Sequence, residues 1–122
     1  MYGLSQDFRV EGLVDSVLSQ ICVGKFDVQF RFDSGTFFCV QGTARMYQKD
    51  QIIANWTEDY VWDDLSFQNI LNCKVLKYSV ENDRVLAIFF ENDFRLELVD
   101  DSQQYESMQI YPKGELSEMI VI

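Results

Sequence analysis

The sequence predicts an α+β fold that is mostly β, built from two pseudo-repeated units that each combine a helix with an antiparallel β meander. Three observations predict it: an internal repeat, alternating apolar residues between turn signals, and two segments with helical spacing. A displacement of 58 positions places residues 29–52 on residues 87–110 without a gap and pairs Phe32 with Phe90, Tyr47 with Tyr105, Gln51 with Gln109 and Ile52 with Ile110. This period exceeds that of common solenoid repeats, so two sheets packed or curved around one core are favoured.

The first unit, about residues 10–54, begins with a segment predicted to be helical. The spacing of its apolar residues lines one side of a helix, namely Leu13, Val14, Val17, Leu18 and Ile21. We expect that side to pack on a sheet, as in most surface helices.

Strands follow in the first unit. Residues 28–32 alternate between apolar and polar, residues 33–35 have turn composition, and residues 36–40 return, which predicts a hairpin. Gly42 ends that strand or marks a bulge, and residues 44–53 are predicted to form one further strand. Residues 55–62 then link the two units.

The second unit, about residues 63–111, is predicted to repeat this order. Residues 63–72 offer acidic residues or Ser66 as an amino-terminal cap and an apolar side, which predicts a short helix. A meander follows over three strands, at 74–80, 84–90 and 94–99, with turns rich in Asn and Asp.

The end of the chain is predicted to belong to the fold. A turn at residues 100–102 leads into residues 103–111, which the Pro-Lys-Gly of residues 112–114 interrupts. Residues 119–122 are apolar and are expected to pair as a strand or pack on the core. The alternative is an exposed association surface.

Length and composition predict one soluble domain over residues 1–122. The chain is 48% hydrophobic and 15% aromatic, and a chain of this length buries roughly two thirds of its unfolded surface around a single core. No apolar run approaches the roughly 20 residues of a membrane span, and the first residues lack a secretory signal pattern. Cys22, Cys39 and Cys73 form an odd set without CxxC spacing, so we expect reduced core thiols in the cytoplasm.

Charge is divided unevenly along the chain. Residues 1–54 contain six acidic and five basic residues, whereas residues 55–122 contain fourteen acidic and five basic residues, within a formal net charge of −10. Such a field repels nucleic acid and anionic membrane surfaces and speeds encounter with a basic partner. Binding to nucleic acid or to a membrane is therefore not expected.

The residues that catalysis usually needs are missing. The sequence has no histidine, so a serine or cysteine nucleophile would need another base, and neither a dinucleotide-binding nor a P-loop glycine pattern occurs. A pair of carboxylates could act in a glycosidase, but most acidic residues fall in turns, where solvated carboxylates are ordinary. The full calcium-loop pattern is absent, and 91–93 matches only a fragment of it. We expect no enzyme activity, cofactor or metal.

Two acidic regions are the candidate partner-binding sites. The first combines carboxylates for steering with aromatic area for tight contact, in Glu58, Asp59, Tyr60, Trp62, Asp63 and Asp64. The second consists of Glu91, Asp93, Glu97, Asp100, Asp101 and Glu106. There, Glu97 is expected to point outward with Arg95, which makes one sheet surface and its loops negative. The alternatives are core or linker aromatics beside solubilising acids, and an ordinary solvated face.

Part of the second unit resembles a known class of proteins. Residues 86–98, with the run Phe-Phe-Glu-Asn-Asp-Phe-Arg, followed by Tyr105, Glu106 and Ser107, resemble small bacterial immunity proteins of polymorphic toxin systems. The likeness covers about the last third of the chain. The first unit has Tyr47, Gln48 and Lys49 where that pattern has tyrosine, glutamate and serine.

The resemblance implies a cytoplasmic immunity protein of the contact-dependent growth inhibition type, which binds and neutralises a toxin domain. An acidic inhibitor suits a nuclease toxin, because the cleft of such an enzyme must be basic to hold its substrate. Two other functions remain open: a small-ligand module using space between the sheets, and a homodimeric adaptor joined through the carboxy-terminal strand.

Overall fold

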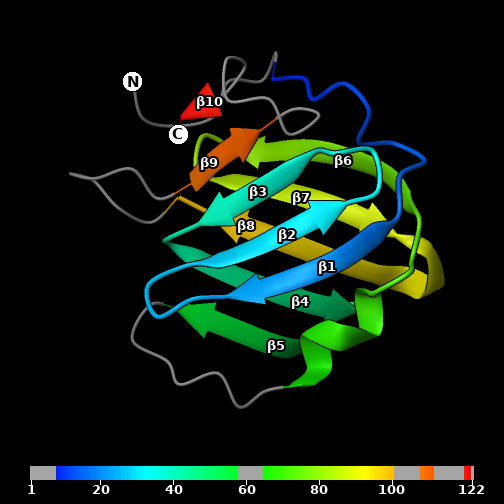
Figure 1. Ribbon diagram of the computed structural model, residues 1–122. Coiled ribbons are helices and arrows are strands. Elements are labelled where there is room, and N and C mark those ends of the chain that lie inside the picture. The colour runs from blue at the N-terminus through cyan, green and yellow to red at the C-terminus, as the bar shows by residue number, and fades with distance from the viewer. Residues whose placement is uncertain (1–7, 58–64, 101–107, 112–119, 122) are drawn as a thin grey trace.

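Ten antiparallel strands form two facing sheets in the computed structural model, which describes residues 8–57, 65–100, 108–111 and 120–121 (Figure 1). The first sheet has the order β1-β2-β3-β9-β10, with β1 Leu18–Val23, β2 Val28–Phe32, β3 Phe37–Val40, β9 Met108–Tyr111 and β10 Ile120–Val121. The second has the order β5-β4-β8-β7-β6, with β4 Thr43–Gln48, β5 Gln51–Thr57, β6 Val75–Asn82, β7 Val85–Phe90 and β8 Phe94–Val99.

The alternation of apolar residues places one side of each strand in the space between the sheets. β2 and β8 show it most regularly, because every second residue of each is buried. The inner faces meet in a continuous core that includes Phe30, Phe38, Trp56, Ile88 and Leu96. Burying each such side chain contributes about 1.5 to 3 kcal/mol. The core therefore accounts for a sandwich rather than one curved sheet.

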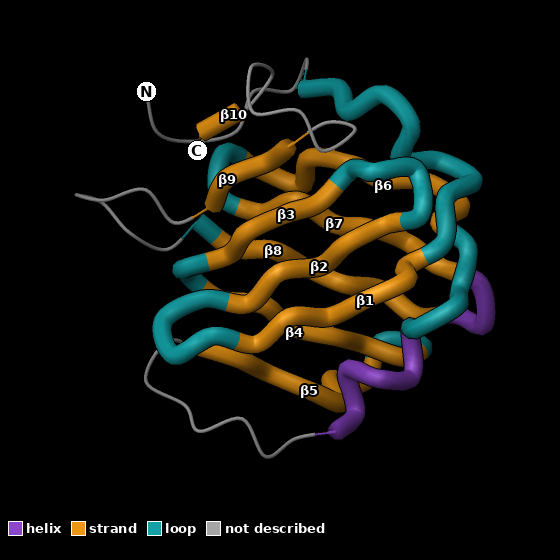
Figure 2. The backbone as a smooth tube through the Cα atoms, in the orientation of Figure 1, coloured by secondary structure: helices purple, strands orange, loops and turns teal. Residues whose placement is uncertain are grey.

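Each unit contributes a three-stranded meander to one sheet and passes its next two strands to the other. β1, β2 and β3 are followed by β4, which pairs with β8 of the second unit, and by β5, which pairs with β4. In the same way β6, β7 and β8 are followed by β9, which pairs with β3 of the first unit, and by β10, which pairs with β9. The two units are therefore interlocked, and neither sheet is made from one unit alone (Figure 2).

Hydrogen bonds reveal a pseudo-twofold axis where the units meet. Val17 and Lys74 form an isolated antiparallel bridge between equivalent positions. On one side of it the Leu18 amide donates to the Cys73 carbonyl at 3.2 Å, and on the other the Val75 amide donates to the Ser16 carbonyl at 2.8 Å. A twofold rotation that exchanges the two units also exchanges these two hydrogen bonds, as expected at a pseudo-twofold axis.

The offset between equivalent residues changes along the chain. It is 57 at the bridge, where Val17 matches Lys74, and 58 in the meanders, where Phe38 matches Leu96. Ile110 pairs with Phe38, and Met46 pairs with Leu96, which is the equivalent of Phe38. Met46 and Ile110 are therefore equivalent positions, and the offset between them is 64. The sequence pairing of Ile52 with Ile110 is therefore wrong, because extra residues precede β9.

The predicted helices are wrong, and the fold is all-β rather than α+β. Residues 13–17 precede β1 as an irregular segment in which Asp15 has φ 71°, a left-handed conformation that interrupts a helix. Val14 is 45% exposed although the helical spacing put it beside the buried Leu18. In the second unit the expected helix is a short 3-10 segment, η1 Leu65–Ile70, with the left-handed Asn72 after it. No α-helix occurs among the described residues, and none of them forms a helix able to cross a bilayer.

Most predicted strands are confirmed, with one division. The hairpin β2–β3 and the meander β6–β7–β8 lie where the alternation placed them, with the short η2 Glu91–Asp93 between β7 and β8. The single strand expected over 44–53 is instead parts of two strands, β4 and β5, joined by a turn at Lys49 and Asp50. The apolar carboxy-terminal segment does pair as a strand, because β10 joins β9.

The sandwich has two distinct ends. The end containing the Val17–Lys74 bridge also carries the turns β2–β3, β4–β5 and β7–β8, and we call it the bridge end. The other end carries the turns β1–β2, β3–β4 and β6–β7, and the carboxyl ends of β5 and β8. We call it the acidic end, for the composition described below.

Candidate functional site

The two acidic segments predicted to bind a partner continue from strands that end close together. In the second sheet Thr43 of β4 pairs with Thr57 on one side and with Val99 on the other. β5 ends at Thr57 and β8 ends at Val99, so one strand separates these two ends. Neighbouring strands lie about 4.8 Å apart, which places the two chain exits about 10 Å apart. The segments themselves, 58–64 and 101–107, lie outside the described residues.

Negative charge is concentrated in the connections attached to the acidic end. In sequence, they contain nine of the twenty acidic residues and two of the ten basic residues, namely Asp27, Glu58, Asp59, Asp63, Asp64, Asp83, Asp100, Asp101 and Glu106 with Lys25 and Arg84. The connections at the bridge end contain eight acidic and four basic residues, namely Glu11, Asp15, Asp33, Asp50, Glu91, Asp93, Glu115 and Glu118 with Arg9, Lys49, Lys74 and Lys113. The acidic end therefore has the larger excess.

The strands, in contrast, present basic residues on the outer faces of the sheets. Arg31 lies on the first sheet, and Arg45, Lys77 and Arg95 lie on the second. The described strands of the second sheet contain two acidic residues, Glu97 of β8 and Glu81 near the end of β6, where Glu81 accepts a hydrogen bond from the Ser79 hydroxyl at 3.0 Å. β8 therefore does not form the negative sheet surface that was expected from the sequence.

Glu97 is held by two arginines. Its Oε1 lies 3.1 Å from Nη2 of Arg45, and its Oε2 lies 3.2 Å from Nε of Arg95. Its side chain is only 14% exposed. Because both oxygens are engaged and little of the carboxylate reaches solvent, Glu97 serves to neutralise the two arginines rather than to present charge.

Asp100 is fully buried at the end of β8. Its amide donates to the Arg84 carbonyl at 2.7 Å, and its carbonyl accepts a hydrogen bond from Nη1 of Arg84 at 3.3 Å. These bonds fix the turn β6–β7 against the exit of β8. Asp100 therefore positions the segment that follows, and its carboxylate is not part of the surface.

Glu91 and Asp93 lie before the start of β8, and Asp100 lies after its end, whereas Asp101 and Glu106 lie outside the described residues. Oε1 of Glu91 accepts a hydrogen bond from the Lys74 amide at 2.6 Å, which mirrors the bond from the Val17 amide to Oδ1 of Asp33 at 3.0 Å. Both pairs support the bridge. Since β8 has six residues and a strand rises about 3.3 Å per residue, roughly 20 Å separates Glu91 and Asp93 from Asp100. The second acidic region is therefore divided between the two ends.

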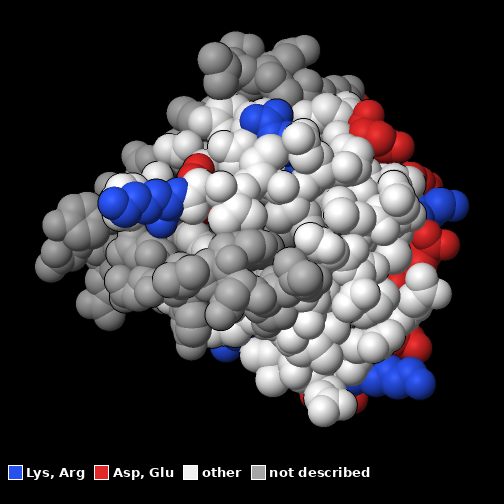
Figure 3. Space-filling model, turned by 60° about the horizontal axis from the view of Figure 1, so that its bottom comes forward, with Lys and Arg blue, Asp and Glu red and all other residues white. Residues whose placement is uncertain are grey.

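Acidic side chains are exposed at the bridge end as well. Figure 3 shows acidic side chains gathered along the right margin of the described surface, beside lysine or arginine side chains. The turns of the bridge end and the segment before β1 contain the exposed residues Asp15, Asp33, Asp50, Glu91 and Asp93. Because Asp33 and Glu91 each bind a backbone amide, part of this charge has a structural use.

Of the aromatic residues beside the first acidic region, the structure describes Trp56. It is 2% exposed and faces inward from β5, so it belongs to the core. Tyr60 and Trp62 lie outside the described residues.

Cys39 has the one clearly shifted pKa among the described residues. Its Sγ donates to Oδ2 of Asp27 at 3.2 Å, on the outer face of the first sheet. Burial, then the hydrogen bond to Asp27 and the charge of that carboxylate, raise the pKa of Cys39 from 9.0 to about 12. The thiol stays protonated at neutral pH, which makes it a poor nucleophile and metal ligand. In the described part of the chain, no three His, Cys, Asp or Glu side chains are grouped as for a metal ion.

A row of side chains on the outer face of the second sheet was not predicted from the sequence. Lys77, Phe89, Arg95 and Tyr47 stand in register on four neighbouring strands. Alternation placed Arg95 outward, but the row depends on how β4 pairs with β8, which is a contact between the two units. The one local signal was a pair of large aromatic residues at outward positions.

Comparisons with protein families, curated proteins and solved structures give no match for this chain. The candidate site is therefore defined by its own geometry and composition.

Proposed function

We propose that this protein is an immunity protein that binds a basic toxin domain in the cytoplasm and neutralises it through the acidic end of the sandwich. The mechanism is a stable one-to-one complex without a chemical step. A nuclease is the toxin class that fits best, because its substrate-binding cleft must attract a polyanion.

The observation that carries the proposal is the shared exit of the two acidic segments. Pairing of β4 with both β5 and β8 places Thr57 and Val99 on either side of Thr43. Residues 58–64 contain four acidic and no basic residues, and residues 101–107 contain two acidic and no basic residues. Like charges are costly to bring together, so an arrangement that starts both segments at one place is best explained by a cationic partner.

The distribution of the remaining charge supports the same orientation. The outer faces of the strands carry Arg31, Arg45, Lys77 and Arg95, so a basic partner is repelled from the sheets and guided to the ends. The aromatic Tyr60 and Trp62 in the first acidic segment supply the apolar area that a tight interface needs at its centre.

The resemblance to immunity proteins supports the class of partner. The resembling run of residues 86–98 forms β7, η2 and most of β8, so it builds the strand that leads into the second acidic segment. Small acidic inhibitors of this class act by occupying or covering a toxin, which requires shape and charge but no catalytic residue.

The test is co-expression with the basic carboxy-terminal domain of a secreted protein encoded beside this gene. Neutralising one segment with Glu58→Gln, Asp59→Asn, Asp63→Asn and Asp64→Asn is expected to slow association at low salt by at least about 10-fold and to abolish protection of cells. Association is measured by stopped-flow fluorescence, and protection by survival of cells that produce the toxin.

A matched control changes the same number of charges in the connections of the bridge end, with Glu11→Gln, Asp15→Asn, Glu115→Gln and Glu118→Gln. Asp15 has a positive φ, which asparagine adopts as readily as aspartate. This control is expected to retain protection. Equal protection by both variants, or a larger loss in the control, would refute the assignment to the acidic end.

A further inference from the structure

A second site lies on the outer face of the second sheet, away from the acidic end. Lys77 of β6 pairs with Phe89 of β7, Phe89 pairs with Arg95 of β8, and Arg95 pairs with Tyr47 of β4. Two contacts within this row are between a cation and a ring. The Lys77 Nζ lies 4.8 Å from the centre of the Phe89 ring, and the Arg95 Cζ lies 4.2 Å from the centre of the Tyr47 ring.

The pseudo-equivalent row on the first sheet is a closed stack. The Arg31 Cζ lies 4.2 Å from the centre of the Phe37 ring, and the Phe37 and Tyr111 rings are stacked with centres 4.3 Å apart. Under the relation between the units, Arg31 corresponds to Phe89, Phe37 to Arg95 and Tyr111 to Tyr47. The first sheet therefore shows that one guanidinium and two aromatic rings can fill the three equivalent positions of the row.

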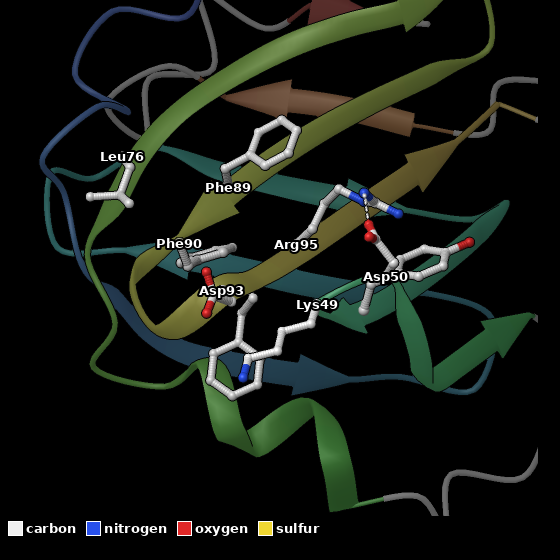
Figure 4. A pocket seen from close by; sticks show the side chains of 9 residues that line it. Lys49, Asp50, Leu76, Phe89, Phe90, Asp93 and Arg95 are labelled. Atoms are coloured by element: carbon white, nitrogen blue, oxygen red, sulfur yellow. Dashed lines mark ion pairs between the residues drawn. The ribbon is translucent and has the colours of Figure 1, made fainter.

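On the second sheet the row is not filled. A hollow of about 240 Å³ opens beside it, and its lining includes Leu76, Phe89, Arg95, Lys49, Asp50 and Asp93. Figure 4 shows Leu76, Phe89 and Phe90 on one side, Arg95 and Asp50 on the other, and Lys49 along the lower margin. The hollow therefore combines an apolar wall with a charged one.

Leu76 is placed there by an irregularity in β6. The register shifts between Val75 and Lys77, so Leu76 is the extra residue of a bulge, and it is 54% exposed. Bulges re-aim side chains and are frequent beside binding sites. The first sheet has the equivalent bulge between Leu18 and Gln20, but there the extra residue is Ser19. The large apolar side chain is thus specific to the unit that has the hollow.

Arg95 is held so that one face of its guanidinium borders the hollow. The Glu97 carboxylate lies 3.2 Å from Nε and the Asp50 carboxylate lies 3.9 Å from Nη1, so Arg95 has two acidic neighbours beside the hollow. The Tyr47 ring covers one face. A planar cation fixed in this way can take a second ring on its other face.

We propose that this hollow binds one aromatic side chain of a partner protein, with the ring packed between Leu76 and Phe89 on one side and the Arg95 guanidinium on the other. An aromatic ring suits the lining better than a cation, because the two basic residues Lys49 and Arg95 and the two acidic residues Asp50 and Asp93 leave the lining without a net charge. The volume is below the roughly 300 Å³ at which pockets for free small ligands begin, so an anchor residue of a protein fits better than a separate ligand. This site does not depend on the proposed function.

The test is a titration of the isotope-labelled full-length protein with N-acetyl-tryptophanamide, followed by amide chemical shifts. Saturable shifts are expected at Leu76, Phe89 and Arg95, with a dissociation constant in the millimolar range, and none are expected at Phe37 or Tyr111. Leu76→Asp is expected to abolish the shifts. Ile52→Asp is the matched control, because Ile52 is equally an exposed apolar residue of the same face, 50% exposed on β5, and it is expected to bind normally.

A second pair of variants examines the guanidinium. Arg95→Lys is expected to weaken binding about 3-fold, the scale of one exposed cation–ring contact, whereas Arg31→Lys on the first sheet leaves it unchanged. N-acetyl-leucinamide and N-acetyl-argininamide are the comparison probes, and free tryptophan represents a separate ligand. Equal binding of the leucine or arginine probe, tighter binding of free tryptophan, or shifts at Phe37 would each overturn the proposal.

Discussion

At the scale of single residues, the environment of Cys39 shows how a carboxylate near a thiol can suppress its reactivity. Asp27 reaches Cys39 across the turn β1–β2, where the Gly24 amide donates to the Asp27 carbonyl at 2.9 Å. A Cβ atom at Gly24 would collide with the Asp27 carboxylate. The glycine therefore makes room for the carboxylate that accepts the hydrogen bond of the thiol.

The first prediction concerns this thiol. The pKa of the Cys39 thiol is about 12 in the folded protein, against an ordinary value of 9.0. The neutral thiol therefore stabilises the folded state fully below pH 9, and this contribution is lost as the pH rises from 9 toward 12. The difference in free energy of unfolding between the wild type and Cys39→Ala is therefore expected to shrink between pH 9 and pH 11. Denaturant titrations at each pH measure it.

Asp27→Asn separates the causes of the shift. Burial is the largest cause, so the pKa of Cys39 is expected to fall but to stay above 9.0. Alkylation by iodoacetamide, followed by mass spectrometry of the Cys39 peptide, gives the midpoint. Cys22, which is partly exposed on β1, serves as the internal reference. A midpoint for Cys39 equal to that of Cys22 in the wild type would contradict the assignment.

At the scale of elements, turns determined which sequence expectations succeeded. The hairpin β2–β3 was predictable because Gly35 supplies a positive φ of 94° in a Ser-Gly turn. The turn between β4 and β5 has positive φ at both Lys49 and Asp50, 56° and 71°, but no glycine marks it. The sequence pattern therefore predicted one continuous strand. The turn at Lys49 and Asp50 reverses the chain and places β5 at the edge of the second sheet.

The second prediction follows from that turn. Two consecutive residues with positive φ match a type I′ hairpin, for which Asn-Gly is strongly preferred. Lys49→Asn with Asp50→Gly is expected to stabilise the protein by roughly 1 kcal/mol, because neither residue is then strained. The loss of the contact between Asp50 and Arg95 costs little, since the Asp50 side chain is fully exposed. Urea denaturation measures the change.

The same dipeptide at the turn β6–β7 is the control. Asp83 and Arg84 do not have positive φ, so Asp83→Asn with Arg84→Gly is expected to destabilise the protein. A gain at both turns, or at neither, would show that the conformation of the β4–β5 turn is not the cause.

The helices illustrate a different limit. Leu13 and Leu18 are both buried, as the helical spacing required, but an irregular segment followed by a strand buries the same residues. Periodicity over nine residues cannot separate these two structures when left-handed residues such as Asp15 and Asn72 interrupt the chain. The helix predicted for residues 63–72 of the second unit was wrong for the same reason.

At the scale of the whole molecule, the exchange of strands between units decides where the acidic segments lie. Both segments were identifiable from the sequence as runs of acids, but their common origin at one end depends on β4 pairing with β8. That contact joins residues about fifty positions apart and carries no local signal. The composition of a site could thus be predicted here, while its assembly required the topology.

The third prediction is that this exchange makes the two units unfold together. Each sheet contains strands of both units, and paired hydrogen bonds join them at Val17 and Lys74, so opening one unit removes the pairing of the other. Unfolding in urea is expected to be a single transition with coincident midpoints by circular dichroism and by the fluorescence of Trp56, isolated with Trp62→Phe. Asp33→Ala and Glu91→Ala remove equivalent supports of the bridge, and each is expected to lower the midpoint, by about 1 to 2 kcal/mol in free energy, without changing the slope. If Asp33→Ala split the transition so that the tryptophan signal and the circular dichroism separated, the two units would be independently stable and the interlocked sandwich would not be the cooperative unit.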